Sequence, residues 1–374
     1  MKHSVLILCD YKALYGGNFI PSVTDLALYT REKGSDVGFI FGTESEGRDW
    51  LVSIREMGFP VYMINKGGLL SEARQVEAIA KETNATIIHA HFGFMTAARI
   101  TALKIPSLRL ILHQHSDFSA GKSLPFKRKL KLAGAALLDL LLGKRLLNIN
   151  VGYGMKRKRN TVIIPNALSV SRFDADRSSR SETRRSLGIA DQDTFVLLLG
   201  WSPYVKGVDI AVNAMQKAPA GSGLKLGIVC GREYTEQVLK DWIQSRGLPI
   251  RDDVVFLQPT EEIYRYYKAC DIMLSASRSE TFAYSILETL LAGKWVVMSD
   301  IPGTAWAAEY PIVSSFRSED PVSCLEAILD AKKRLSEPDC PGICAEVSSQ
   351  VRSSYCIRHW SEQIFTEYER ISRS

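Results

Sequence analysis

Short apolar runs alternate with amphipathic stretches along the first part of the chain. The apolar runs predict strands at residues 5–9, 37–41, 61–64, 86–90 and 108–112. Apolar positions three and four residues apart predict helices between them, at 22–33, 48–57 and 70–83. Because strands that alternate with helices pair in parallel, this region predicts an α/β domain whose sheet has helices on both faces.

The same alternation restarts after a polar stretch. Residues 174–191 hold few apolar side chains, which places a hinge near 168–190. Beyond it the pattern predicts strands at 195–199, 225–230, 254–257, 272–275 and 295–299, and helices at 208–217, 235–246, 260–269, 283–292 and 321–335. We therefore expect two doubly wound domains, with a ligand cleft between them at the carboxyl ends of the strands.

The expected domain boundaries follow from these two series. Residues 1–170 form the first domain and residues 171–355 the second, while 356–374 is a tail whose apolar and charged positions alternate as in an amphipathic helix. The hydrophobic content of 46% and charged content of 24% suit a globular protein with a buried core. No apolar stretch is long enough to cross a bilayer, and the first apolar run is too short for a signal peptide, so we expect a cytoplasmic protein.

Cysteine usage and charge narrow the possible partners. The seven cysteines are odd in number and form no C-x-x-C pair, which indicates reduced, mostly structural thiols. The net charge of +6 is concentrated in basic clusters within 122–131, 144–145 and 156–159, which suit anionic partners. We do not expect nucleic acid among them, because no aromatic residues are interleaved with the basic ones in a binding motif.

The segment 122–145 allows two interpretations. It joins basic residues to a leucine-rich stretch. One interpretation is a core helix with a solvated basic start. The other is a helix that lies on a membrane surface, with its apolar side chains in the lipid and its cations on anionic headgroups.

Two glutamates flank a predicted helix start in the second half of the chain. Glu280 lies in the loop after strand 272–275, and Glu288 lies two turns into the next helix. Between them, Thr281, Phe282 and Ala283 begin the helix, where free backbone N–H groups and the helix dipole favour a phosphate. Each carboxylate can accept hydrogen bonds from sugar hydroxyls. The alternative is a pair of ordinary surface and helical glutamates.

A second loop carries a single cation at a comparable place. Gly200 and Trp201 follow strand 195–199, and Lys206 stands just before the next helix. A lysine there can neutralise a departing diphosphate, although a surface lysine is the simpler alternative. In the first domain, Gly16 and Gly17 follow the first strand, where glycines let the backbone approach a ligand closely.

Four of the six histidines end two consecutive strands. His89 and His91 end one strand, and His113 and His115 end the next. We do not predict a metal site, because no acidic ligand accompanies them at metal-binding spacing. Buried structural histidines and ligand-facing histidines both remain open. Asp174 and Asp176 form a D-x-D sequence, but it lies in the polar linker rather than after a strand, and we assign it no metal.

Residues 270–303 and 199–209 closely resemble the donor-binding region of family 4 retaining glycosyltransferases. The family signature is a Glu, seven intervening residues and a second Glu, matched by Glu280 and Glu288, with Gly293 and Gly303 at the flanking glycines. Thr281 stands where the family usually has Gly. Leu199–Asp209 resembles the family's Lys-Gly element, with Trp201 where an Arg is common.

The resemblance implies roles for single residues. Glu288 would hold the ribose hydroxyls, Glu280 would contact the donor sugar, and Lys206 would bind the diphosphate. A histidine at the end of the strand at 108–112 would touch the donor sugar. His113 fits this position by strand register and His115 by local pattern. The loop of Gly16 and Gly17 would border the phosphates and the acceptor.

The resemblance also implies the fold and the activity. The fold is GT-B, with two Rossmann-like domains facing across a cleft and a C-terminal helix that crosses back to the first domain. The activity is hexosyl transfer from a nucleoside diphosphate-sugar, a UDP-sugar by preference, to a glycan or lipid-linked acceptor. The transfer retains the anomeric configuration and needs no metal or other cofactor. The biological setting is capsule, exopolysaccharide or other cell-envelope glycan synthesis, at the inner face of the membrane.

Two other functions remain as alternatives. One is a different GT-B enzyme, such as a sugar-nucleotide epimerase or a phosphorylase. The other is a non-catalytic GT-B subunit that binds or chaperones a partner.

Overall fold

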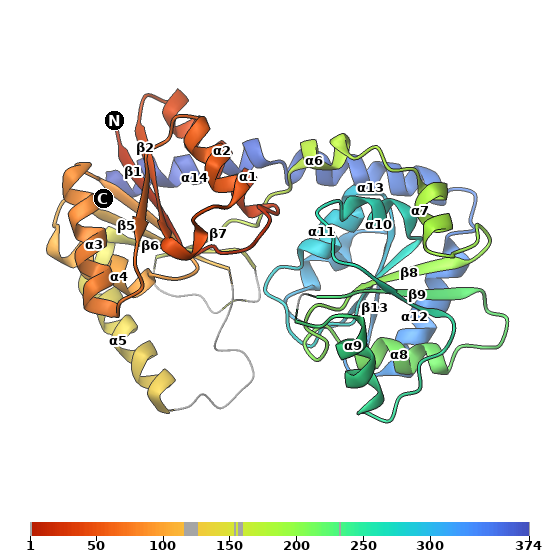
Figure 1. Ribbon diagram of the computed structural model, residues 1–374. Helices are drawn as coiled ribbons and strands as arrows, with labels where there is room; N and C mark the ends of the chain where they lie inside the picture. The colour runs from red at the N-terminus through yellow and green to blue at the C-terminus, as the bar shows by residue number, and fades with distance from the viewer. Residues whose placement is uncertain (1, 116–125, 153–154, 156–159, 232, 374) are drawn as a thin grey trace. The chain divides into compact units, whose positions relative to one another are not determined.

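The computed structural model describes residues 2–115, 126–152, 155, 160–231 and 233–373, except for the side chains of 127 and 128. The chain divides into two compact units. Unit 1 contains Met1–Ser169 together with Ile357–Ser374, and unit 2 contains Val170–Cys356. The C-terminal helix therefore belongs to the same unit as the first strand, as the predicted crossing helix requires (Figure 1).

Unit 1 is built on a parallel sheet of seven strands in the order β3-β2-β1-β4-β5-β6-β7. The centre of the sheet is the most apolar part of the unit, because its strands are covered on both faces. The strands are β1 (Ser4–Cys9), β2 (Asp36–Gly42), β3 (Val61–Ile64), β4 (Ile87–His91), β5 (Arg109–Gln114), β6 (Leu146–Asn150) and β7 (Thr161–Ile163).

Helices cover both faces of this sheet (Figure 1). The core on one face joins β1 and β2 to α1, α2 and α14, and the core on the other face joins the sheet to α3 and α4. Helix α5 packs on α4. The helices are α1 (Phe19–Glu32), α2 (Asp49–Glu56), α3 (Leu69–Glu82), α4 (Met95–Lys104), α5 (Phe126–Leu142) and α14 (Ile357–Ser372), with short 3-10 turns at Thr43–Ser45 and Gly143–Arg145.

Unit 2 repeats the design with six parallel strands in the order β10-β9-β8-β11-β12-β13. They are β8 (Thr194–Leu199), β9 (Leu224–Val229), β10 (Val254–Leu257), β11 (Ile272–Ser275), β12 (Trp295–Ser299) and β13 (Val313–Phe316). Helix α8 packs with α12, and α11 packs with α13. The helices are α6 (Val170–Ala175), α7 (Arg180–Ser186), α8 (Val208–Gln216), α9 (Glu236–Gln244), α10 (Tyr264–Ala269), α11 (Tyr284–Leu291), α12 (Pro321–Arg334) and α13 (Cys340–Ser354), with a 3-10 turn at Ala305–Glu309.

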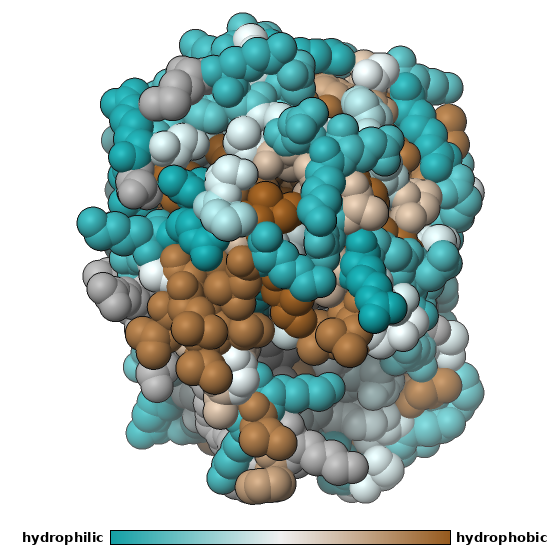
Figure 2. Space-filling view, turned by 90° about the vertical axis from the view of Figure 1, so that its left-hand side faces the viewer, coloured by the Kyte–Doolittle hydropathy of each residue, from teal (hydrophilic) through white to brown (hydrophobic). Residues whose placement is uncertain are grey.

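Helix α5 is not a core helix, so the first interpretation of segment 122–145 is wrong. Its side chains Phe126, Leu137, Leu140 and Leu141 are 57% to 80% exposed. Figure 2 shows apolar side chains gathered on the face of unit 1 where α5 lies. The contact with α4 includes an ion pair between the buried Arg99 and the partly buried Asp139, in which Arg99 Nε donates to Asp139 Oδ1 at 2.5 Å. Residues 122–125 lie outside the described part of the chain.

None of the helices in the described part of the chain combines the length and the hydropathy that a membrane span requires.

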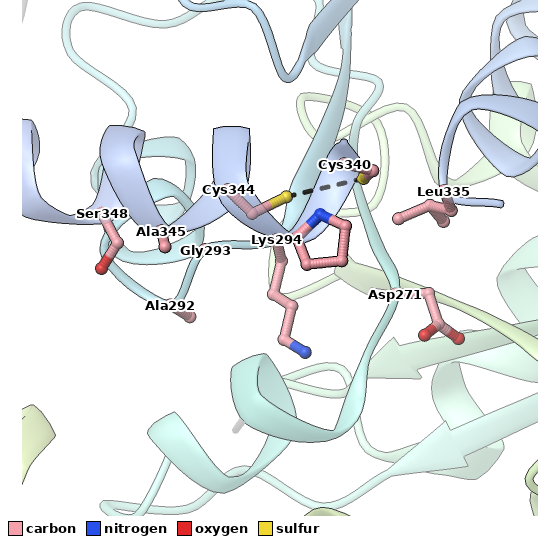
Figure 3. A pocket seen from close by; sticks show the side chains of 10 residues that line it. Asp271, Ala292, Gly293, Lys294, Leu335, Cys340, Cys344, Ala345 and Ser348 are labelled. Atoms are coloured by element: carbon pink, nitrogen blue, oxygen red, sulfur yellow. Dashed lines mark hydrogen bonds between the residues drawn. The ribbon is translucent and has the colours of Figure 1, made fainter. Parts of the chain in front are cut away.

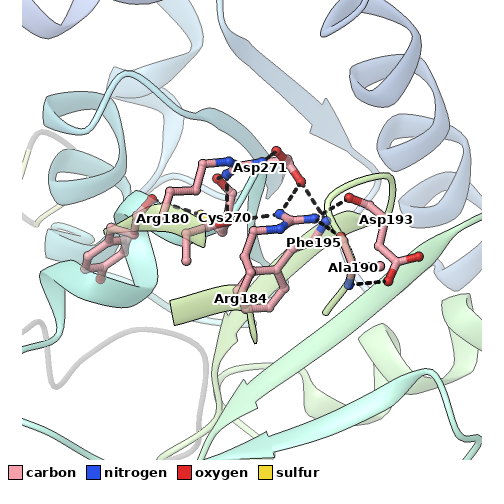
Figure 4. Close-up of polar contacts among 9 residues, drawn as sticks. Arg180, Arg184, Ala190, Asp193, Phe195, Cys270 and Asp271 are labelled. Atoms are coloured by element: carbon pink, nitrogen blue, oxygen red, sulfur yellow. Dashed lines mark hydrogen bonds and ion pairs between the residues drawn. The ribbon is translucent and has the colours of Figure 1, made fainter. Parts of the chain in front are cut away.

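The predicted polar hinge is folded as α6 and α7 and anchored by a buried arginine (Figure 4). Arg184 is fully enclosed, and its guanidinium donates to Asp271 Oδ2 at 3.1 Å and to the carbonyl oxygens of Ala190 and Asp193 at 2.6 Å each. Arg180 donates to the other carboxylate oxygen of Asp271 at 2.6 Å. The same carboxylate accepts the backbone N–H of Phe195, the second residue of β8, at 2.8 Å. Helix α7 is thereby fixed to the amino ends of β8 and β11.

Replacing Arg184 with Met should lower the free energy of unfolding by about 3–5 kcal/mol, because Asp271 loses one of its two arginine partners and the carbonyl oxygens of Ala190 and Asp193 lose their donor. Urea unfolding followed by circular dichroism measures the change. Arg185→Met is the matched control, since Arg185 is the exposed neighbour on the same helix. Equal unfolding midpoints for the two variants would contradict the assigned role of Arg184.

Candidate functional site

The two loops singled out from the sequence follow neighbouring strands of unit 2. Strands β8 and β11 pair directly, with Val196 opposite Ile272. The chain leaves β8 at Gly200 and β11 at Ala276, so both loops emerge at the same edge of the sheet. The strand order also reverses between β8 and β11, which is where parallel sheets of this kind bind ligands.

Two glycines allow these loops to pack against each other. Gly207 has a left-handed backbone with φ of +65°, and a Cβ there would lie 1.9 Å from the carbonyl oxygen of Ala276. A Cβ on Gly303 would lie 1.9 Å from the carbonyl oxygen of Glu280. Both distances are far below van der Waals contact, so only glycine fits. The loop that carries Glu280 is therefore held between backbone segments from two other parts of unit 2.

Lys206 and Glu280 meet directly at this edge. Lys206 Nζ donates to Glu280 Oε1 at 2.5 Å, and the Ser277 hydroxyl donates to the same oxygen at 2.8 Å. Both charged side chains are only 12% exposed. An ammonium group has three donors, so Lys206 can keep Glu280 and still donate to a phosphate.

Aromatic and ionic contacts hold the lysine loop in place. The Lys206 ammonium lies 5.0 Å from the centre of the Trp201 ring, which is 55% exposed. Arg278 makes a two-pronged ion pair with Asp209, with both N···O distances at 2.9 Å. The backbone N–H of Arg278 also donates to the carbonyl oxygen of Val205 at 2.8 Å. Arg278 and Asp209 were not predicted as part of the site.

The start of α11 lies directly after the Glu280 loop. Ala283 is the residue before the helix, and no side chain caps the helix there. Phe282 stacks on Trp306 with ring centres 4.8 Å apart, which fixes the approach of Thr281 and Ala283 to the helix. The first N–H groups of α11 are therefore oriented toward the same edge as Lys206.

Glu288 is buried in the second turn of α11 and has a partner that the sequence did not reveal. Its Oε2 accepts a hydrogen bond from the Tyr267 hydroxyl on α10 at 2.8 Å. Burial, together with the neighbouring Glu288 carboxylate, raises the pKa of Tyr267 well above its ordinary value, so Tyr267 stays a donor. This contact orients one carboxylate oxygen of Glu288.

The loop with Gly16 and Gly17 follows β1, at the point where the strand order of unit 1 reverses. The Tyr11 hydroxyl donates to the carbonyl oxygens of Tyr15 and Gly16 at 3.0 and 3.2 Å. Gly17 has a φ of +56°, and its Cβ position lies 3.5 Å from the Tyr11 hydroxyl. Tyr11 therefore shapes this loop just before helix α1.

The four strand-end histidines form one stack in unit 1. Register places His91 opposite His113 on β4 and β5. His91 Nδ1 lies 2.9 Å from His115 Nε2, and His89 Nε2 lies 3.2 Å from His113 Nδ1. His89 Nδ1 in turn lies 2.8 Å from the Tyr368 hydroxyl on α14.

Exposure distinguishes the two histidines that the sequence left open. His113 is fully enclosed, whereas His115, just past the end of β5, is partly exposed. Burial lowers the pKa of His89 and of His115 to about 3, and it lowers the pKa of His91 and His113 well below 6.5. All four rings are therefore neutral at physiological pH.

The stack does not have the shape of a metal site. One ring nitrogen from each of His89, His91 and His113 lies within 4.8 Å of the others. The His113 ring is nearly parallel to the other two, with interplanar angles of 18° and 25°. Ligands of a tetrahedral zinc instead point at one centre about 2 Å away. The absence of a required metal remains a prediction.

The D-x-D sequence of the linker is engaged in ion pairs. Asp174 makes a two-pronged contact with Arg352 on α13, at 2.8 Å for each N···O pair. Asp176 accepts hydrogen bonds from Ser178 and lies 3.4 Å from the Lys268 ammonium. Both carboxylates thus bind cations of the protein.

Part of unit 2 is similar to known glycosyltransferases. Residues 179–309 match the family model of glycosyl transferases group 1. An uncharacterized glycosyltransferase of Methanocaldococcus jannaschii is 30% identical over 145 residues, which cover 38% of this chain and 36% of that protein. The alpha-monoglucosyldiacylglycerol synthase of Streptococcus pneumoniae is 24% identical over 323 residues, which cover 77% of this chain and 71% of the synthase.

A solved structure matches the fold over both units. HepE from Anabaena, in complex with UDP-glucose, superposes with a TM-score of 0.76 at 19% sequence identity. The match covers 98% of this chain and 99% of the HepE chain. The predicted fold class, two Rossmann-like parallel-sheet units with a C-terminal helix returning to the first, is confirmed.

The neutral histidine stack predicts a loss of stability in mild acid. An unfolded chain protonates its histidines near pH 6.5, whereas the folded stack does not, so stability falls as pH drops below that value. The three fully enclosed rings are those of His89, His91 and His113. Between pH 7.5 and 5.5 they should lower the free energy of unfolding by about 4 kcal/mol in total, at about 1.4 kcal/mol each. Urea midpoints at the two pH values measure it. His359→Gln, at an exposed position, should leave the pH dependence unchanged, and equal midpoints for the wild type would contradict the prediction.

Proposed function

We propose that this chain, which carries a glycosyl transferases group 1 domain on a GT-B fold, moves a sugar from a nucleoside diphosphate-sugar to a glycan or lipid-linked acceptor. The donor is a UDP-sugar, the anomeric configuration is retained, and the product belongs to a cell-envelope polysaccharide or glycolipid. The UDP-glucose in HepE and the glycolipid named in the Streptococcus pneumoniae synthase support these choices.

The observation that carries the proposal is the convergence of Lys206, Glu280 and the uncapped start of α11 at one edge of the unit 2 sheet. A diphosphate in this place would receive the Lys206 ammonium and the first N–H groups of α11, together with the positive end of the helix dipole. These donors would stabilise the negative charge that develops on the departing nucleotide.

The two glutamates take different parts of the donor. Glu288, oriented by Tyr267, would accept hydrogen bonds from the ribose hydroxyls. Glu280, held by Lys206 and Ser277 through Oε1, would offer its Oε2 to a hydroxyl of the transferred sugar. With no nucleophile assigned, the leaving phosphate would take the acceptor proton in a front-face attack.

Unit 1 would supply the remaining contacts. The partly exposed His115, rather than the enclosed His113, would reach the donor sugar, as a neutral hydrogen-bonding group. The loop of Gly16 and Gly17 would border the phosphates and the acceptor. No metal ion takes part in this scheme, because Lys206 and the helix start supply the positive charge.

The donor assignment is tested by thermal shift with UDP-, GDP-, ADP- and dTDP-sugars in metal-free buffer. A donor at a hundred times its Kd adds about 2.7 kcal/mol, which raises the Tm by about 5–10 °C. We expect this for one UDP-sugar, with loss of the shift in Glu288→Ala and no effect of Glu337→Ala, a control at an exposed position.

The other outcomes separate the alternatives. A shift with a different base would replace UDP as the donor nucleotide. No shift with any donor would favour a non-catalytic GT-B subunit. A donor that gives a thermal shift and is converted to an isomer, with no transfer of its sugar, would favour a sugar-nucleotide epimerase. Proton NMR of the product distinguishes retention from inversion.

The exposed helix α5 supports a second part of the proposal, contact with a membrane. Phe126 is 80% exposed and Leu140 64%, and Lys129 and Lys131 are exposed on the same helix. Such a helix can place its apolar side chains at the lipid boundary while each lysine gains about 1 kcal/mol near an anionic surface. A lipid-linked acceptor would then reach the enzyme from the bilayer.

Vesicle flotation tests this contact. We expect the protein to bind vesicles that contain phosphatidylglycerol more than tenfold better than pure phosphatidylcholine vesicles. A Leu137→Glu, Leu140→Glu double variant should lose binding, because it places two carboxylates on the exposed face of α5. Val322→Glu, on an exposed apolar position of α12 in unit 2, is the control. Equal binding by the double variant and the wild type would contradict the role of α5.

A further inference from the structure

A pocket of about 400 Å³ lies at the opposite end of the unit 2 sheet from the candidate site (Figure 3). Its lining includes Asp271 and Lys294, the residues directly before β11 and β12. Lys206 and Glu280, by contrast, lie after the carboxyl ends of β8 and β11. The pocket is therefore separate from the proposed donor site.

Two free thiols from α13 line this pocket. Cys340 and Cys344 lie one turn apart at the start of the helix, and their sulfur atoms are 3.8 Å apart. Figure 3 shows both side chains on the same side of α13. Among the cysteines of the described residues, these two sulfur atoms are in contact.

The geometry of a helical turn comes close to that of a disulfide. Residues four apart in a helix are separated by about 6 Å along the axis, which falls within the Cα···Cα range of about 4.4–6.8 Å seen in disulfides. Their Cβ atoms, at about 5–6 Å, must approach to about 4 Å. The intervening Gly342 has no atom within 4 Å of its Cβ position, so that side of the first turn of α13 faces open space.

We propose that Cys340 and Cys344 are a redox modification site, closing to a reversible disulfide within α13 when the protein meets a small organic disulfide such as oxidised glutathione. One protein thiolate attacks the reagent, forms a mixed disulfide and releases one glutathione thiolate. The second protein thiolate displaces the second glutathione. Two protein thiols are oxidised, one disulfide reagent is reduced, and the two thiol protons end on the two glutathione products.

Burial sets the rate of this reaction. Burial and the neighbouring Cys340 raise the pKa of Cys344 to about 12, while the nearby Lys294 ammonium acts in the opposite direction. The thiolate is the attacking species, so the reaction is slow at neutral pH and becomes faster as pH rises. Burial also lowers the pKa of Lys294 below its ordinary value.

The helix makes the disulfide easy to reduce. Closing it forces the Cβ atoms closer than a regular turn places them, and strained disulfides have higher reduction potentials than relaxed ones. The dithiol is therefore the form expected in a reducing compartment, and the disulfide forms only when oxidant accumulates.

Peptide mapping tests the proposal directly. Both cysteines fall within residues 335–352, a single tryptic peptide that contains no other cysteine. The folded protein is treated with oxidised glutathione at pH 7.0 and 8.5, blocked with iodoacetamide and digested. We expect this peptide to appear two hydrogens lighter than the free dithiol and unalkylated, to form at least tenfold faster at pH 8.5, and to return to the dithiol with reduced glutathione.

Two variants complete the test. Cys340→Ser should instead yield a glutathione adduct on Cys344, whereas Cys356→Ser should leave the intrahelical disulfide unchanged. Circular dichroism before digestion shows that each variant is folded. A wild-type peptide that stays fully alkylated on both cysteines, or that carries only glutathione adducts after hours at pH 8.5, would overturn the proposal.

Discussion

The pairing of the Asp271 carboxylate with Arg180 and Arg184 is the interaction on which the arrangement of unit 2 depends. The carboxylate joins Arg180 and Arg184 of α7 to the second residue of β8, and it stands itself at the start of β11. Strands β8 and β11 are thereby held side by side from their amino ends. Their carboxyl ends carry the loops of Lys206 and Glu280, so a contact at one edge of the sheet fixes which residues meet at the other.

The repeated strand–helix pattern predicted the fold class because each strand is a distinct apolar run. It failed where local signals conflict with tertiary structure. Residues 168–190 contain the boundary between the units, as predicted, but their polarity concealed two helices. Helix α7 forms there with Arg184 buried against Asp271. Helix α4 was missed because its small residues show little amphipathic periodicity, and α13 was missed because Pro341 and Gly342 disguise its first turn.

The sequence predicted those parts of the candidate site that follow from the spacing of residues along the chain. The spacing of Glu280 and Glu288 and the loop of Lys206 lie where parallel strands end, so their common edge could be inferred. The partners of these residues could not. Tyr267 reaches Glu288 from another helix, and Asp209 pairs with Arg278 across a separation of 69 residues. Likewise, only the folded stack shows that His113 is enclosed while His115 is partly exposed.

Helix α14 affects the order in which the two units can fold during synthesis. The core of unit 1 is completed by Trp360, Ile364 and Tyr368, which leave the ribosome only after all of unit 2 has been synthesised. Unit 2 is continuous in sequence and has all its strands before them. During synthesis, unit 1 therefore keeps an uncovered apolar face until α14 emerges. By then all the strands and helices of unit 2 are already available for folding. The apolar face of unit 1 that α14 covers, which includes α1, is thus the part of the nascent protein that most needs protection.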